Sequence, residues 1–149
     1  MKTDSAASTP PPTQSDIDQE LLEVARGIAA VTWDLKALNT TVIDLRGRVS
    51  YTDFIIVATG TSERHVQALA RRVDSEMRDS GRKSMGTEGL DTGRWALLDY
   101  GDIIVHIFHQ DARKDYDLER MWSEAPRLEL EDAPEELYGH FDGEAFGAR

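Results

Sequence analysis

Two apolar runs separated by only two residues constrain the fold of this chain more than any other feature. Residues 95–100 (WALLDY) and 103–109 (IIVHIFH) have the length and the composition of β-strands, and Gly101 and Asp102 lie between them. A connection this short joins only adjacent antiparallel strands. The sequence therefore predicts a β-hairpin in the second half of the chain.

The rest of the chain alternates between helical and strand patterns. Apolar residues recur at helical spacing over residues 16–31, and the polar segment 59–62 (TGTS) precedes a second helix that Gly81 ends. A third helix is predicted to begin at Asp111 and to end at Pro126. Besides the hairpin, strands are predicted at residues 40–45, 54–58 and 82–85.

This order of elements predicts an α/β fold, a mixed five-stranded sheet with helices on its faces. The strand–helix–strand unit of residues 54–85 favours parallel pairing of its two strands, whereas the hairpin is antiparallel. The folded domain is predicted to span residues 16–127. Residues 1–15, rich in Pro, Ser and Thr, are expected to form a disordered leader, and residues 128–149 a flexible acidic tail.

The charge balance limits the classes of partner. The 149-residue chain carries a net charge of −11, whereas nucleic-acid binding depends on Lys and Arg that neutralise phosphates. We therefore expect a basic protein as the partner and little direct contact with RNA. The absence of cysteine excludes disulfides and thiolate zinc sites. No apolar window is long enough to span a bilayer, so we expect a cytoplasmic protein without membrane contact.

Three carboxylates near strand ends, Asp53, Asp99 and Asp102, are the candidates for catalysis. Metal-dependent transfer sites need carboxylates that converge from neighbouring strands. Asp99 and Asp102 lie three residues apart across a turn, so they cannot share one face of a strand. Aspartates that hydrogen-bond their own backbone in turns are the simpler interpretation. We therefore predict a protein that is not an enzyme and has no cofactor or metal, with a magnesium-dependent nucleotidyltransferase-like enzyme as the alternative.

The first hairpin strand is apolar on both of its faces. Because side chains alternate along a strand, Trp95, Leu97 and Asp99 share one face, and the residues between them share the other. Either the strand is covered on both sides, or one face is an exposed binding patch. An aromatic anchor beside a charge is typical of interface hot spots. The residues alone nevertheless favour burial in the core.

Several stretches of the chain, taken in their order and spacing, resemble the ribosomal silencing factor family, also called the Iojap-like family. The resemblance covers roughly residues 17–127 and does not extend to the leader or to the acidic tail. It is carried by residues 34–37 (DLKA), 53–62 (DFIIVATGTS), 88–89 (EG), 93–108 (GRWALLDYGDIIVHIF) and 113–122 (RKDYDLERMW).

The resemblance implies a nucleotidyltransferase-like fold that lacks the catalytic motif. It also implies a homodimer that binds the large ribosomal subunit through ribosomal protein number fourteen. Such a factor sterically blocks association with the small subunit and represses translation under nutrient limitation. By the same resemblance, Trp95, Leu97 and Asp99 belong to the partner-binding strand, with Tyr100 and Asp102 at its end. The resemblance thus favours exposure of this strand over its burial.

Overall fold

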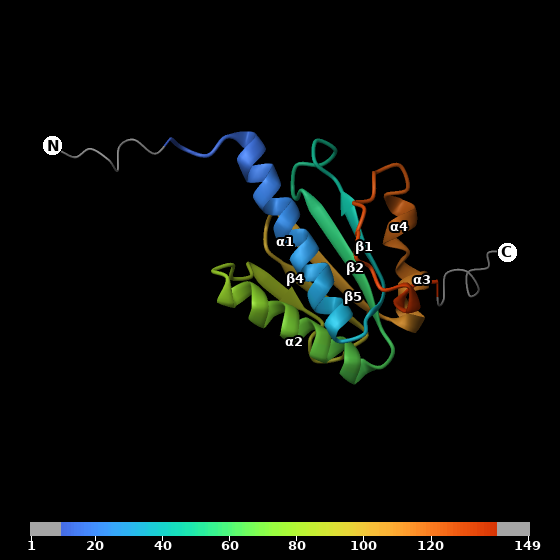
Figure 1. Cartoon of the computed structure of the whole chain (residues 1–149). Coiled ribbons are helices and arrows are strands. Elements are labelled where there is room, and N and C mark those ends of the chain that lie inside the picture. The colour runs from blue at the N-terminus through green and yellow to red at the C-terminus, as the bar shows by residue number, and fades with distance from the viewer. Residues whose placement is uncertain (1–9, 140–149) are drawn as a thin grey trace.

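A mixed five-stranded sheet forms the centre of the structure, a computed structural model that describes residues 10–139 (Figure 1). The strand order β1-β2-β5-β4-β3 confirms the predicted α/β fold. Only β2 and β5 pair in parallel, and the other neighbours are antiparallel. The strands are β1 (Leu38–Asp44), β2 (Phe54–Gly60), β3 (Gly86–Glu88), β4 (Trp95–Asp99) and β5 (Ile103–His109).

The predicted hairpin is present as β4 and β5, but the strand before it differs from the prediction. Residues 82–85 do not form a strand, because the chain joins the sheet only at Gly86, where β3 begins to pair with β4. The parallel pairing expected within residues 54–85 is also wrong. The hairpin inserts between β2 and β3, so β5 rather than β3 becomes the parallel partner of β2.

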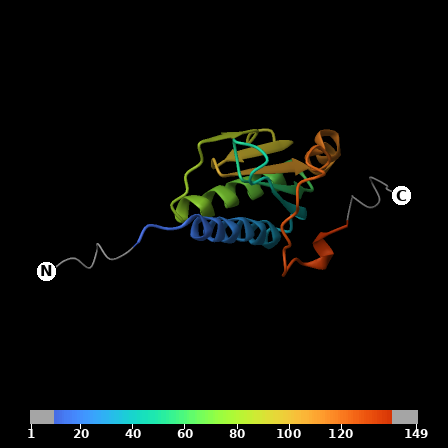
Figure 2. The same ribbon diagram turned by 90° about the horizontal axis from the view of Figure 1, so that it is seen from above.

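Helices cover both faces of the sheet, two on each side (Figure 2). The apolar faces of α1 and α2 bury the larger core, and α3 with α4 covers a smaller one. Helix α1 begins two residues earlier than predicted, because Thr13 rather than Ser15 caps it in a capping box with Asp16. The helices are α1 (Gln14–Asp34), α2 (Glu63–Asp79), α3 (Gln110–Tyr116) and α4 (Leu118–Met121).

The single helix expected from Asp111 to Pro126 is two short helices instead. Asp117 adopts a left-handed conformation (φ 39°) and separates α3 from α4. In a straight helix, residues six apart lie about 120° from each other around the axis. The break lets Glu119 turn back to pair with Arg113, which is only 4% exposed. The guanidinium of Arg113 also donates to the carbonyl oxygen of Asn39 and to Oγ1 of Thr59, both at 2.7 Å.

The chain after α4 returns to the sheet rather than leaving the domain. The amide of Leu128 donates to the carbonyl oxygen of Val42 at 2.9 Å, and Leu137, in a short 3₁₀ turn (Glu135–Leu137), is buried. The expectation of a flexible tail from residue 128 onward is therefore wrong for residues 128–139. Leu128 and Leu130 of this segment also pack against the larger core.

Tyr138 anchors this returning segment by hydrogen bonds. Its hydroxyl accepts from Nε1 of Trp33 at 3.0 Å and donates to the carbonyl oxygen of Thr40 at 2.7 Å. The segment is thereby tied to both α1 and β1. The remainder of the predicted tail (140–149) and most of the predicted leader (1–9) lie outside the described residues.

Within residues 10–139, no helix combines the length and the apolar composition needed to cross a membrane.

Replacing Tyr138 by Phe tests whether this segment stabilises the domain. The change removes one hydroxyl and leaves a half-buried carbonyl and an indole N–H unpaired, so the free energy of unfolding should fall by about 1–2 kcal/mol. Urea unfolding measures the loss. Tyr51→Phe is the matched control, since the Tyr51 side chain is 58% exposed. Equal stability of the two variants would contradict the anchoring role of Tyr138.

Candidate functional site

The two faces of β4 have different surroundings. Ala96 and Leu98 are fully buried in the core beneath α2. Trp95, Leu97 and Asp99 point to the other side of the sheet, and each is partly exposed. The exposed face of β4 is therefore the one that carries the indole. Alternation of side chains along the strand could not predict which of the two faces is exposed.

Strand β5 supplies the neighbours of these side chains. In the antiparallel register, Phe108 lies opposite Trp95, and His106 lies opposite Leu97. His106 was not among the candidate residues from the sequence, although a hairpin with a two-residue connection sets the register that pairs it with Leu97. We call this surface the β4–β5 face, which consists of Trp95, Leu97, Asp99, Ile104, His106 and Phe108.

Aromatic rings hold the indole of Trp95 on three sides. Its ring centroid lies 5.1 Å from that of Phe108 and 5.8 Å from that of His106, in stacked geometry. Tyr116, at the end of α3, tilts against it at 4.3 Å and is itself 45% exposed. Because these contacts restrict the indole before any partner arrives, little side-chain entropy remains to be lost on binding. The face is a rigid, half-open aromatic platform.

A hydrogen bond beneath the platform fixes the orientation of the indole. Nε1 of Trp95 donates to Nδ1 of His106 at 3.0 Å, so the neutral imidazole carries its proton on Nε2. His106 is only 7% exposed, and burial lowers its pKa to about 4. The imidazole is therefore an uncharged acceptor at neutral pH. Since the indole N–H is already used, the exposed part of Trp95 offers apolar and ring contacts.

Two of the candidate residues from the sequence lie away from this platform. Tyr100 is buried on the α2 side of the sheet, where its hydroxyl donates to Oδ1 of Asp74 at 2.7 Å and burial raises its pKa well above the usual range. Asp102 lies at the start of β5 and pairs with Arg82 at 3.3 Å. The structure thus brings together Trp95, Leu97 and Asp99 but not the other two.

Two of the three carboxylates considered for catalysis, Asp99 and Asp102, have structural partners. Asp99 accepts a hydrogen bond from the amide of Gly101 at 2.8 Å, as expected for an aspartate that stabilises a turn. Burial, and then the negative charge of Asp102, raise the pKa of Asp53. In the described part of the chain, no three His, Asp or Glu side chains are grouped to hold a metal ion.

Two glycines, Gly89 and Gly93, let the loop before β4 pass close to the backbone of Trp95 and of Glu63. Gly89 has φ +77°, and a Cβ there would lie 1.8 Å from the carbonyl oxygen of Trp95. Gly93 has φ +71°, and its Cβ would lie 2.5 Å from the carbonyl oxygen of Glu63. Only glycine tolerates both the left-handed backbone and the close approach. The loop therefore positions the start of β4, where the indole projects.

Burial of neutral His106 predicts a specific pH dependence of stability. In the unfolded chain the imidazole titrates near its ordinary pKa of about 6.5, whereas in the fold it titrates at about 4. Between these two pKa values the unfolded state binds more protons than the folded state, so the free energy of unfolding falls as the pH falls. His106 alone should account for a loss of up to about 3 kcal/mol. The measurement is urea unfolding at a series of pH values.

His106→Asn is the matched variant for this measurement, because its side-chain oxygen can replace Nδ1 as the acceptor for Trp95 but does not titrate. Its stability should fall less steeply than that of the unmodified protein between pH 6.5 and pH 4. Parallel curves for the two proteins would show that His106 is not the group responsible.

The chain is similar to proteins of one known family. The family model "Ribosomal silencing factor during starvation" matches residues 18–143. A ribosomal silencing factor RsfS of Halalkalibacterium halodurans is 39% identical over 114 residues, which are 76% of this chain and 95% of that protein. The chloroplastic protein Iojap of Zea mays is 34% identical over 130 residues, 85% of this chain and 55% of that protein.

Solved structures share the fold. A crystal structure of a protein from Chromobacterium violaceum superimposes with a TM-score of 0.67 at 33% identity, over 68% of this chain and 85% of that chain. A crystal structure from Bacillus halodurans superimposes with a TM-score of 0.64 at 36% identity, over 75% of this chain and 99% of that chain. Because the family model matches residues 18–143, most of the chain, this chain belongs to the ribosomal silencing factor family.

Proposed function

We propose that this chain binds the large ribosomal subunit through its β4–β5 face and thereby keeps the small subunit from joining. The observation that carries the proposal is the half-open indole of Trp95, held rigidly among His106, Phe108 and Tyr116. A large aromatic side chain in a preformed setting, partly exposed to solvent, has the properties of an interface anchor. Leu97 and Asp99 beside it add an apolar and a charged contact.

The chemistry of the face supports a basic protein as the direct partner. The chain carries a net charge of −11, which steers it toward positively charged surfaces and away from exposed phosphates. In the proposed complex, Asp99, which is partly exposed on the same face, pairs with a Lys or Arg of the partner. Together with the family resemblance, these features make ribosomal protein number fourteen the proposed partner, with little direct RNA contact.

The proposed mechanism requires occupancy and no chemical reaction. A standard protein–protein interface buries roughly 800 Å² on each partner, an area that a domain of this size can provide. The remaining bulk of the domain then occupies space that the small subunit needs for docking. The proposal includes a homodimer that acts in the cytoplasm and represses translation when nutrients are limiting.

Trp95→Ala tests the anchor. Loss of the indole should weaken binding to isolated large subunits by about 2 kcal/mol or more, which is about 30-fold in Kd. Titration in a co-sedimentation assay measures the affinity. Tyr51→Ala is the control, because Tyr51 is an exposed aromatic residue outside the β4–β5 face and its removal should leave the affinity unchanged.

A subunit-joining assay then tests the consequence of binding. Saturating protein should reduce the formation of whole ribosomes from purified subunits, and Trp95→Ala should need a correspondingly higher concentration for the same effect. A folded Trp95→Ala variant with undiminished affinity would remove the indole from the interface. Unimpeded subunit joining at full occupancy would contradict the steric mechanism itself.

A further inference from the structure

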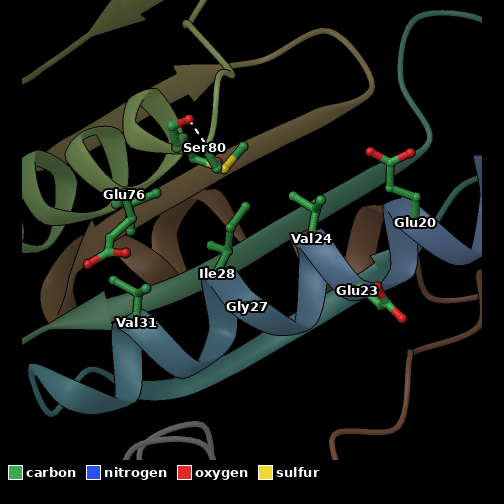
Figure 3. Close-up of a pocket in the computed structure, with 10 residues that line it drawn as sticks. Glu20, Glu23, Val24, Gly27, Ile28, Val31, Glu76 and Ser80 are labelled. Carbon is green, nitrogen blue, oxygen red and sulfur yellow. Dashed lines mark hydrogen bonds between the residues drawn. The ribbon is translucent and has the colours of Figure 1, made fainter.

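A second surface lies on the opposite side of the sheet, between α1 and α2. The two helices leave a groove of about 310 Å³ between them, and Val24, Ile28 and Val31 project from α1 toward α2 along it (Figure 3). Val73 and Met77 of α2 complete an apolar floor. Since the β4–β5 face is on the other side of the sheet, both surfaces are accessible to different partners at once.

Gly27 lies in the middle of α1 and lines this groove. A glycine inside a helix is destabilising relative to alanine, because it gains no side-chain contacts and loses more backbone freedom on folding. A Cβ at Gly27 would meet no atom within 4 Å, so no contact in the described fold requires glycine there. A bare backbone does permit close approach from outside. The backbone of α1 at this position is therefore open to a partner that packs directly against the helix.

The rim of the groove is acidic. Glu20 and Glu23 of α1 are exposed, and neither has a basic partner within residues 10–139. Glu76 of α2 reaches toward Val31 from the other side (Figure 3), and within residues 10–139 it forms one ion pair, with Arg72 at 3.1 Å. The lining contains no Lys or Arg. Such a rim attracts a positively charged partner and repels an acidic one.

We infer that this groove binds an amphipathic helix of another protein, apolar on one side and flanked by Lys or Arg. The lining positions of α1 run from Glu20 to Val31, a length of about 16 Å that matches about three helical turns. An apolar floor with charged edges is the surface that helix-in-groove recognition uses. A second copy of this chain fits less well, because a two-fold interface here would set the same carboxylates against each other.

The probes for this inference are two synthetic helical peptides of about 14 residues with the same apolar stripe. One carries Lys at the positions that flank the stripe, and the other carries Glu. The Lys peptide should bind about tenfold or more tightly than the Glu peptide in fluorescence anisotropy, because of the acidic rim. Amide chemical-shift changes on binding should fall on α1 and α2. Equal affinity for the two peptides would overturn the inference.

Gly27→Leu tests the close approach, because its side chain would fill the space that the partner helix needs. It should weaken binding of the Lys peptide by about tenfold or more. Gly27→Ala should raise the thermal midpoint of unfolding of the free protein, since alanine has the higher helix propensity. It should lower the affinity for the Lys peptide less than Gly27→Leu does. Ala30→Leu, on an exposed site of α1 outside the groove, is the matched control and should leave peptide affinity unchanged.

Two results would contradict the groove as a site for another protein. One is unchanged peptide affinity in folded Gly27→Leu. The other is conversion of a dimer into a monomer by Gly27→Leu in sedimentation, which would make a second copy the occupant. Either failure is distinct from failure of the proposed ribosomal function, because that function is tested by Trp95→Ala on the opposite face.

Discussion

The structure depends on the complete burial of one strand. All seven residues of β2 are buried, so both of its faces need an apolar cover. Helices α1 and α2 provide the cover on one side, and α3, α4 and the chain that follows them provide it on the other. The second cover is the smaller one and is centred on β1, β2 and the adjacent side of β5. Strand β4, farther out in the sheet, is therefore left half open on that side.

This incomplete cover connects the packing of the domain to its proposed interface. The indole of Trp95 belongs to the edge of the smaller core, where it contacts rings from β5 and from α3, and it also faces solvent. The buried imidazole of His106 and the glycine loop before β4 hold it in place. Trp95 therefore contributes to the packing of the free protein and, in the proposed complex, to the contact with the partner.

Particular residues show how far the sequence could predict the structure. The hairpin followed from two strands and a two-residue connection, because such a connection allows only one arrangement. The break at Asp117 was not predictable, since it depends on the buried pairing of Arg113 with Glu119 beneath β1 and β2. The packing of residues 128–139 was missed for a similar reason. Tyr138 finds its partners about 100 residues earlier in the chain, and no local pattern reports such contacts.

For the candidate site, the sequence by itself determined which side chains of β4 share a face, because alternation is a property of the extended backbone. It therefore grouped Trp95, Leu97 and Asp99 correctly and, through the hairpin register, implied their neighbours on β5. Only the tertiary structure decided which of the two faces is open and that Tyr100 lies on the other one. The physical reason is that exposure depends on where α2 and α3 end against the sheet, and contacts distant in sequence set those positions.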